Sequence, residues 1–361
     1  MEASLRILYI ANARFPTRKA HGIQIAKMLE AFTEAGISVE LIAPSFSVGD
    51  AQTFYRLRTG AFRITKAWTT PRRSSRAGFL LSSLLFGITS AALAWKRAGI
   101  VYSVDLDYFS FFLIPFIGKP YFFEIHSAKK DTIFHRLLFR RVAGIIAINE
   151  NVRRELEKTF PLLRGKTMVF PNGVDIQVYA KIVPKELKHP AVVYTGSFQN
   201  WKGMQTVIEA ARALPTIHFY FVGGKEQELG EHIPLNILVV APQAFQDIPA
   251  WQKAADVLLL SGTNLDAYSA NYTSPMKLYE YLAAGRPIVA AKTPAIAQAL
   301  SEREAFFYEP DNAGSLVSAV QATLADPKEA ARRVEMGKQR AREYTWEKRA
   351  ETIIRFLNEK L

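Results

Sequence analysis

Short apolar runs alternate with amphipathic stretches along almost the whole chain. RILYIA at 6–11, for example, is followed by GIQIAKMLEAFTEAG at 22–36, whose apolar residues recur at helical spacing. Strands buried on both faces have continuous Val, Ile and Leu runs, because helices cover both faces of a parallel sheet. The pattern therefore predicts an α/β fold with doubly wound, Rossmann-like sheets.

The apolar runs form two series, and 361 residues are enough for two domains of ordinary size. Periodicity is weakest at 175–190, where Pro and Lys cluster, and we expect the linker there. The expected domains are therefore 1–180 and 181–344. Further helices are expected at 203–214 and 248–257, and further strands at 39–44, 100–104, 121–126, 144–149, 167–173, 191–197, 217–224, 236–242, 256–262 and 287–291.

The excess positive charge is confined to the first half of the chain. Residues 1–185 hold 27 Lys and Arg against 13 Asp and Glu, whereas residues 186–361 hold 19 against 20. A first half with a net charge of +14 suggests an anionic partner: a phosphate-bearing substrate, a membrane surface or nucleic acid. The chain has no cysteine and its first residues show no secretory signal pattern, so we expect a cytoplasmic protein.

Doubly wound sheets bind ligands at the carboxyl ends of their strands, so we expect a site in a cleft between the two domains. Three residues stand where such a site needs them. Gly22 begins a helix whose free amide groups favour a phosphate, His126 ends the strand YFFEIH, and Lys202 precedes the helix that starts beside Gly203. The alternatives are a plain turn glycine, a structural histidine and a solvated loop lysine.

The segment SPMKLYEYLAAGRPIVA at 274–290 predicts a helix that runs into a strand. Ser274 suits the N-cap, Pro275 the first helical position and Gly285 the C-cap. The free amides of residues 275–277 are suited to hold phosphate.

Glu280 is a carboxylate in the second turn of this otherwise apolar helix. Leu278 and Leu282 share another face and are expected to pack on the sheet. A carboxylate here accepts two hydrogen bonds from vicinal hydroxyls, as acidic residues do for ribose in dinucleotide folds. The alternative is an ion pair with Lys277 or Arg286.

The order and spacing of these motifs resemble the retaining glycosyltransferases of the GT-B fold, family four. The resemblance runs from HGIQ through FEIH, PNGVD and GSFQNWKG to the helix of Glu280 and the tail TWEKRAETII, so it covers nearly the whole chain. It implies two Rossmann-like domains whose sheets face a central cleft. The first domain would bind the acceptor and the second a nucleotide-sugar donor, with the final helix, about 345–361, returning to the first.

The resemblance also implies residue roles. His126, Lys202 and Glu280 are expected to be catalytic: Glu280 binds the ribose hydroxyls, Lys202 the phosphates, and His126 lies near the donor sugar. The remaining residues expected to bind the donor are Gly22, Gly196, Ser197, Gly203, Ala241, Pro242, Gln243, Tyr272, Ser274, Pro275, Met276, Lys277 and Leu278, with the base near 241–243.

Two positions depart from the family pattern. The first glutamate of the E-x7-E motif, which helps to hold the donor sugar, is replaced by Tyr272, and the usual Gly-Arg pair reads Gly196–Ser197. One sugar anchor and one phosphate-binding charge are therefore missing. We hypothesise that Lys277 supplies part of the missing charge.

The resemblance implies a hexosyltransferase-type enzyme of class EC 2.4. We expect it to be independent of metal, because the second half has no D-x-D, and to need no cofactor besides the donor co-substrate. Asp105 and Asp107 do form a D-x-D, but they follow a strand of the first half, where a helix cap is the expected role.

The stretch 71–97 is apolar in its centre and basic at its ends. It fits a buried helix, an interfacial helix or, at the lower length limit, a membrane span. Together with the basic first half, it favours a lipid-linked or cell-surface glycan acceptor and a peripheral contact with an anionic membrane on its inner face. Nucleic acid is not expected, because no recognised binding module is present.

Two other functions compete with transfer. Tyr272 and Ser197 favour a catalytically weak GT-B protein that binds a sugar nucleotide or a partner without transfer. A sugar-nucleotide epimerase of related fold is the third alternative, and the Glu280 helix and closing tail count against it.

Overall fold

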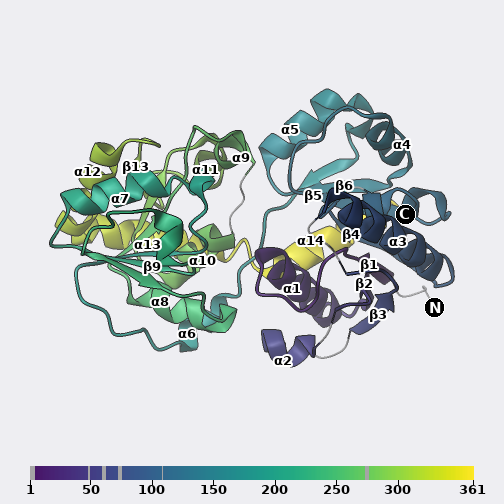
Figure 1. Ribbon diagram of the computed structural model, residues 1–361, viewed down its shortest axis with the longest axis horizontal. Helices are drawn as coiled ribbons and strands as arrows, with labels where there is room; N and C mark the ends of the chain where they lie inside the picture. The colour runs from purple at the N-terminus through teal and green to yellow at the C-terminus, as the bar shows by residue number, and fades with distance from the viewer. Residues whose placement is uncertain (1–4, 48, 59–61, 72–74, 108, 273–275) are drawn as a thin grey trace. The chain divides into compact units, whose positions relative to one another are not determined.

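The computed structural model describes residues 5–47, 49–58, 62–71, 75–107, 109–272 and 276–361. They form two compact α/β units, each built on a parallel sheet (Figure 1). Unit 1 comprises Met1–Pro171 and Trp346–Leu361, and unit 2 comprises Asn172–Thr345. The boundary therefore falls earlier than the expected residue 181, and the last helix belongs to unit 1.

The sheet of unit 1 has seven strands among the described residues, in the order β3-β2-β1-β4-β5-β6-β7. All its pairings are parallel, and the order reverses between β1 and β4. The strands are β1 (Arg6–Ile10), β2 (Ser38–Pro44), β3 (Arg63–Ala67), β4 (Ile100–Val104), β5 (Tyr121–Ile125), β6 (Gly144–Ala147) and β7 (Thr167–Val169). The helices are α1 (Ala20–Glu34), α2 (Ala51–Tyr55), α3 (Arg76–Trp95), α4 (Ile133–Arg141), α5 (Glu150–Thr159) and α14 (Trp346–Glu359), with 3-10 turns η1 (Phe109–Phe111), η2 (Ile114–Phe116) and η3 (Pro161–Leu163).

The sheet of unit 2 has six strands in the described chain, in the order β10-β9-β8-β11-β12-β13, again all parallel. Its strands are β8 (Ala191–Thr195), β9 (His218–Val222), β10 (Ile237–Val240), β11 (Val257–Leu260), β12 (Ile288–Ala291) and β13 (Phe306–Tyr308). Its helices are α6 (Ile176–Lys181), α7 (Met204–Ala213), α8 (Ile248–Ala254), α9 (Ala267–Asn271), α10 (Met276–Ala284), α11 (Pro294–Ala299), α12 (Ala313–Ala325) and α13 (Pro327–Ala341), with 3-10 turns η4 (Asn200–Lys202), η5 (Glu226–Leu229) and η6 (Phe245–Asp247).

The predicted pair of doubly wound sheets is confirmed, and the strands that prediction missed are both at sheet edges. The sequence of β3, RITKA, mixes charged and apolar residues because only part of an edge strand is buried. β13 has three residues, too few to be recognised as a run. Gly285 ends α10 with φ +67°, the left-handed conformation expected of a C-cap glycine.

The segment expected to be a linker is partly helical. Residues Ile176–Lys181 form α6, and Tyr179 of this helix is buried in the core of unit 2. Pro and Lys weakened the periodicity of this segment, but one buried aromatic residue is enough to anchor a short helix. The prediction of a linker over 175–190 was therefore wrong for its first part.

α14 connects the end of the chain to its beginning, because it packs against α1 of the same unit (Figure 1). Its apolar residues recur at helical spacing, and Ile353 and Leu357 are fully buried. The final sixteen residues thus complete the core of unit 1.

α3 is the one helix of the described chain that is long and apolar enough to cross a membrane by length and composition. It is nevertheless part of unit 1, where it packs against η1, β2 and β3. Phe86, Ala91 and Ala94 are buried there. Of the three roles expected for this stretch, burial applies to one face of the helix, whereas the other face is exposed.

We predict that Ile353→Ala lowers the free energy of unfolding of unit 1 by about 2–5 kcal/mol, the usual cost of a large-to-small change in a core. Denaturant unfolding of the full chain measures this change. Glu351→Ala, an exposed position on the same helix, is the control and is expected to have almost no effect. Equal effects of the two variants would contradict the packing described for α14.

Candidate functional site

The first group of candidate residues surrounds the carboxyl end of β8 in unit 2. β8 lies between β9 and β11, so the direction of strand order reverses at this strand. Such switch points are where doubly wound sheets bind ligands. The loop Gly196–Ser197 follows β8 directly, and Lys202 comes from the short turn η4 after it.

Two lysine ammonium groups meet at this strand end. Lys202 Nζ donates to Ser197 Oγ at 2.9 Å and contacts the Ser197 carbonyl at 3.3 Å. Lys277 Nζ, from the first turn of α10, lies 3.8 Å from the centre of the Tyr194 ring. Within the described residues, Lys277 Nζ is buried without a hydrogen-bond partner, and neither lysine forms an ion pair with a carboxylate.

The pKa values of both lysines are lowered. Burial lowers the pKa of Lys202 to about 8. Burial, and then the positive charge of Lys202, lower the pKa of Lys277 well below its ordinary value, against the opposing effect of Glu280. Removal from water and mutual repulsion both destabilise the charged forms of two adjacent lysines. An anion bound between them offsets both effects, so such a pair attracts an anion.

Glu280 is positioned by a chain of hydrogen bonds. Its Oε2 accepts from Gln252 Nε2 at 3.1 Å, and Gln252 Nε2 also donates to Thr195 Oγ1 at 3.2 Å. The hydroxyl of Tyr179 donates to Gln252 Oε1 at 2.5 Å. Gln252 is fully buried, so its amide holds the carboxylate in place from below. The pKa of Glu280 is raised above its ordinary value, because burial outweighs the lowering effects of the Gln252 hydrogen bond and of the charge of Lys277.

The alternative reading of Glu280 as half of an ion pair does not describe this structure. Arg286 donates instead to the carbonyl of Lys253 at 2.7 Å. Within the described residues, no ion pair joins Glu280 to Lys277 or Arg286, and the only hydrogen bond to its carboxylate is the one from Gln252. The other carboxylate oxygen therefore has no protein partner there.

Gly203 is required by close backbone contact. Its φ is +70°, and a Cβ at this position would lie 2.6 Å from the carbonyl oxygen of Gly262, in the loop after β11. A side chain would therefore push α7 away from the end of β11. The glycine holds the start of α7 against the strand ends where the lysines lie.

The other residues expected to bind the donor are partly brought to this region. Ala241, Pro242 and Gln243 form the loop after β10, and Gln243 Nε2 donates to the Ala241 carbonyl at 2.8 Å. Tyr272 follows α9 and Met276 begins α10. Ser274 and Pro275 lie outside the described residues.

Leu278 requires a correction. We grouped it with the residues that bind the donor, but its side chain is 1% exposed and belongs to the core of unit 2. It shares this core with Leu282, as the helical spacing predicted. The face of α10 that holds Leu278 packs inward, so only the face of Lys277 and Glu280 is left for a ligand.

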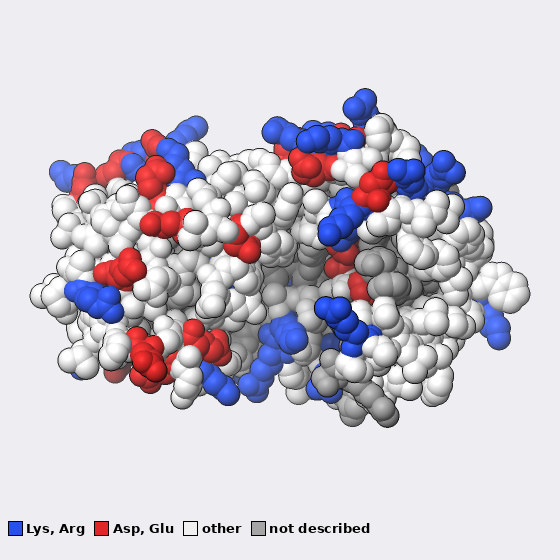
Figure 2. Space-filling view, turned by 45° about the horizontal axis from the view of Figure 1, so that its top comes forward, with Lys and Arg blue, Asp and Glu red and all other residues white. Residues whose placement is uncertain are grey.

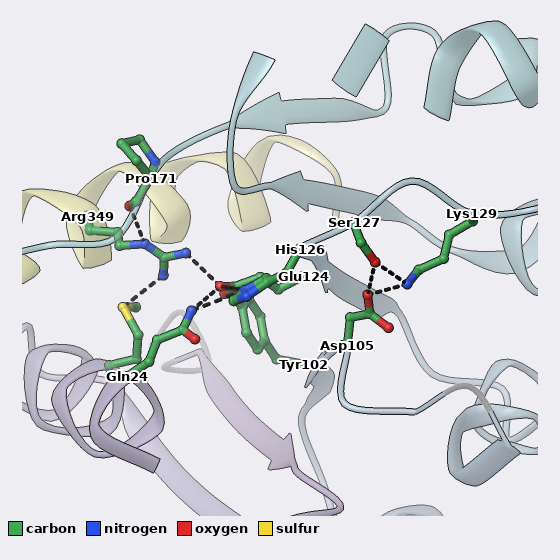
Figure 3. A network of polar contacts seen from close by, with 10 residues as sticks. Gln24, Tyr102, Asp105, Glu124, His126, Ser127, Lys129, Pro171 and Arg349 are labelled. Atoms are coloured by element: carbon green, nitrogen blue, oxygen red, sulfur yellow. Dashed lines mark hydrogen bonds and ion pairs between the residues drawn. The ribbon is translucent and has the colours of Figure 1, made fainter. Parts of the chain in front are cut away.

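The second group of candidate residues surrounds a fully buried ion pair in unit 1 (Figure 3). Arg349 of α14 donates from Nη2 to Glu124 Oε1 of β5 at 2.8 Å. Its Nε donates to the Pro171 carbonyl at 2.8 Å, and its Nη1 lies 2.9 Å from Met28 Sδ of α1. One guanidinium thus joins the last helix to the central sheet, to the end of unit 1 and to α1.

Glu124 gathers three more polar side chains around its carboxylate (Figure 3). Gln24 and Tyr102 donate to it, and His126 Nε2 lies 2.8 Å from its Oε1. Burial alone raises the pKa of Glu124, but Arg349, His126 and Tyr102 outweigh it and lower that pKa to about 2. The carboxylate is therefore charged at neutral pH and can only accept hydrogen bonds.

This charge decides which ring nitrogen of His126 carries a hydrogen. Because Glu124 accepts, Nε2 of His126 must donate, which leaves Nδ1 outside the network. The side chain of His126 is 25% exposed, whereas Glu124 is fully buried. His126 is thus a partly exposed imidazole whose orientation is held from the interior.

Gly22 lies in the first turn of α1 for a packing reason. A Cβ there would meet the Thr17 side chain at 2.4 Å and the Tyr55 hydroxyl at 2.6 Å. The same hydroxyl bonds the backbone of Thr17 through both its donor and its acceptor. Glycine therefore lets the loop after β1 fold closely over the start of α1.

Asp105 and Asp107 have separate partners. Asp105 forms an ion pair with Lys129 and accepts from Ser127 (Figure 3). Asp107 Oδ1 accepts from the Ser110 amide at 2.8 Å, the arrangement of a helix cap that we expected. Within the described part of the chain, no group of three His, Cys, Asp or Glu gathers as metal ligands would.

Several residues of these networks were not predicted: Gln24, Glu124, Tyr179, Thr195, Gln252 and Arg349. Glu124 carried a usable signal, because it is the one charge inside the buried strand YFFEI, just as Glu280 is in its helix. Arg349 and Gln252 gave no such signal in the sequence. Each lies on a helix, and which face of that helix is buried depends on the tertiary fold.

Two doubly wound units, each with a parallel sheet, form the architecture of the GT-B fold class. The family model for Glycosyl transferases group 1 matches residues 189–326, and that for Glycosyltransferase Family 4 matches residues 22–178. The chain therefore belongs to the family-four, group 1 glycosyltransferases, as its motifs indicated.

Solved structures share this fold at low sequence identity. Sucrose-phosphate synthase from Thermosynechococcus elongatus matches with a TM-score of 0.76 and 16% identity, over 98% of each chain. HepE from Anabaena in complex with UDP, which has also been solved with UDP-glucose, matches with a TM-score of 0.71 and 16% identity, over 98% of this chain and 100% of its own. WaaG, a glycosyltransferase involved in lipopolysaccharide biosynthesis, matches with a TM-score of 0.68 and 15% identity, over 96% of this chain and 99% of its own. No curated protein matches the chain by sequence.

We predict that Arg349→Met lowers the stability of unit 1 by about 3–5 kcal/mol, because it leaves the Glu124 carboxylate buried and unpaired. Adding Glu124→Gln removes that charge, and the double variant is expected to regain part of the loss. Denaturant unfolding at pH 7 measures both. A double variant less stable than Arg349→Met alone would contradict this account.

The same pair predicts how stability depends on pH. The pKa of Glu124 is lower in the folded chain than its ordinary value of 4.5, so its contribution is complete above that value and is lost as the pH falls toward 2. The Glu124→Gln variant is expected to lack this part of the acid destabilisation.

Proposed function

We propose that this glycosyltransferase binds a nucleotide-diphosphate sugar on unit 2 and transfers the sugar with retained anomeric configuration. The observation that carries the proposal is a pair of lysines, the partly buried Lys202 and Lys277 with its buried Nζ, that have no carboxylate partner among the described residues. A diphosphate supplies two adjacent negative charges, which match two adjacent cations. Binding would raise the lowered pKa values of both lysines.

The position of Glu280 supports a nucleotide rather than inorganic diphosphate. One of its carboxylate oxygens is held by Gln252, and the other has no partner in the described chain. That oxygen is free to accept from ribose hydroxyls, the role that acidic residues have in dinucleotide folds. HepE, a protein of the same fold, was solved with UDP and with UDP-glucose, so uridine donors are the first to test.

The transfer step places most of the charge on the leaving group. The bond between the anomeric carbon and the diphosphate oxygen breaks, and the acceptor hydroxyl oxygen forms the new bond on the same face. The hydroxyl proton passes to the leaving diphosphate. Lys202 and Lys277 stabilise the charge that develops there, which is the usual source of the largest catalytic contribution. His126 stays a prediction as the residue near the donor sugar.

Lys277 accounts for the departure at Ser197. The family arginine that would contact the phosphates is absent, and Ser197 instead accepts the Lys202 ammonium. Lys277 brings a second cation to the same strand end from a different helix. We infer that this lysine replaces the missing charge.

The acceptor and the setting are inferred from charge. The basic first half of the chain favours an anionic or lipid-linked acceptor, such as a growing cell-surface glycan, on the cytoplasmic face of a membrane. The phosphate charge is neutralised by lysines in this proposal, so transfer would need neither a metal ion nor another cofactor.

We predict that one donor from a panel of UDP-, GDP- and ADP-sugars raises the melting temperature of the chain and is slowly hydrolysed. Glu280→Ala is expected to lose both effects, because the ribose hydroxyls lose their acceptor. Glu209→Ala, an exposed carboxylate on α7, is the control. Stabilisation without hydrolysis or transfer would favour the binding protein over the enzyme, and no response to any donor would contradict the proposal.

We predict that Lys277→Ala weakens donor binding by about tenfold to a hundredfold, the range for losing a hydrogen bond to a charged group. Lys292→Ala, an exposed lysine of the same unit, is the control and is expected to bind normally. Binding by the unaltered chain should also weaken as the pH rises above about 8, because Lys202 then loses its charge. Calorimetric titration measures both, and unchanged affinity and turnover in Lys277→Ala would refute its assigned role.

A further inference from the structure

Helix α3 of unit 1 has an apolar exposed face, although its buried face contains three serines. Apart from Arg76 in its first turn, every exposed residue of this helix is apolar. These residues recur at steps of three and four, so they form one continuous stripe along twenty residues. We call it the α3 face: Ala77, Leu80, Leu81, Leu84, Ile88, Ala92 and Trp95.

Meanwhile the polar residues of α3 point into the unit. Ser82 is fully buried and donates to the Thr70 carbonyl at 2.7 Å, and Ser83 accepts from Asn12 at 3.3 Å. Ser90 is also fully buried. A helix that covers a core normally presents its apolar stripe inward and its polar residues to water. Here the inner face is already satisfied, and the apolar stripe is left without a partner in the described chain.

The α3 face is too apolar to be an ordinary surface. The side chains of Leu81, Leu84 and Ile88 are 52%, 49% and 47% exposed, and that of Trp95 is 65% exposed. Single exposed apolar residues are normal, but a contiguous apolar patch marks an interaction site. Trp68, 59% exposed, extends the patch, because its carbonyl accepts from Thr89 of α3 at 2.8 Å.

The charges around this face identify the partner. The stretch 51–104, which contains α3, has nine Lys and Arg residues and no Asp or Glu. Figure 2 shows basic side chains on the surface of unit 1. Those at exposed positions in the described chain are Arg56, Arg58, Arg63, Lys66, Arg76 and Lys96. Of these, Arg58 is paired with Glu34 and Glu347.

An apolar stripe with tryptophan residues and basic flanks is the pattern of a helix that lies in a membrane interface. Basic side chains near anionic headgroups each add to binding, while the apolar side chains enter the boundary of the acyl chains. A second copy of the chain is a poor match, because it would bring one basic surface against another. Nucleic acid would leave the apolar residues without partners.

We propose that the α3 face, with Trp68, docks unit 1 on the surface of a bilayer that contains anionic lipid. This inference deepens the proposed transfer to a lipid-linked acceptor and rests on it for its purpose. The surface would hold unit 1, with its candidate residue His126, at the membrane where such an acceptor lies. α3 lies on the membrane rather than across it, since its other face is part of the core of unit 1.

Vesicle flotation with the full chain tests this proposal without donor or turnover, so its failure is separate from failure of the proposed function. We expect binding to vesicles of phosphatidylcholine with phosphatidylglycerol, weaker binding as salt increases, and little binding to phosphatidylcholine alone. The double variant Leu81→Ser with Leu84→Ser is expected to lower the affinity for these anionic vesicles by about tenfold or more.

Three controls make the test specific. The variant Leu235→Ser with Leu265→Ser changes two exposed leucines of unit 2 and is expected to bind vesicles normally. Lys66→Gln with Lys96→Gln should weaken binding only to anionic vesicles. Thermal unfolding and donor hydrolysis of the Leu81 and Leu84 variant should match those of the unaltered chain, because both residues are exposed and the proposed donor site is formed by residues of unit 2.

A tryptophan signal locates the contact. Emission is expected to shift to shorter wavelength on anionic vesicles, and Trp68→Phe with Trp95→Phe should remove the shift although three other tryptophans remain. Absence of vesicle binding, or equal binding by the Leu81 and Leu84 variant, would overturn the proposal. It would also be overturned by a dimer in sedimentation velocity that this variant dissociates, which would assign the face to a second copy.

Discussion

The fully buried ion pair of Arg349 and Glu124 is the interaction on which unit 1 depends. It joins the last helix of the chain to a central strand, and its carboxylate also holds Gln24, Tyr102 and His126. A buried charge is costly unless it is paired and fully hydrogen-bonded, so each of these partners is needed by the others. The one partly exposed member is His126, which means that a buried network determines the orientation of a candidate catalytic residue.

In unit 2, as in unit 1, a buried polar residue positions a candidate site residue, but the nearby charges are paired differently. Gln252 is buried and donates to Glu280, but Lys202 and Lys277 have no carboxylate partner within the described ranges. The buried charges of Arg349 and Glu124 in unit 1 are therefore paired with each other, whereas Lys202 and Lys277 of unit 2 have no carboxylate partner among the described residues. This difference explains why we place the donor on unit 2. It also supports the proposal that Lys277 supplies the positive charge that is missing at Ser197.

The two faces of α3 have different roles: one face is part of the core of unit 1, and the other is the proposed membrane contact. Its serines complete the interior of unit 1 by hydrogen bonding, so its apolar residues are free to face outward. Together with the absence of acidic residues over 51–104, this arrangement connects the basic charge of the chain to one surface. A transferase that acts on a lipid-linked acceptor needs such a surface, because the acceptor is confined to the membrane.

The sequence by itself indicated the two doubly wound sheets and the family, and it singled out Lys202, Lys277 and Glu280 as candidate ligand residues, because apolar periodicity and charges beside apolar segments are local signals. The edge strands β3 and β13 and the helix α6 within the expected linker were decided by tertiary packing. So were the partnership of Glu124 with Arg349 and the outward apolar face of α3. These features join residues that are distant in the chain, or depend on which face of a helix the rest of the fold covers, and no local pattern records either.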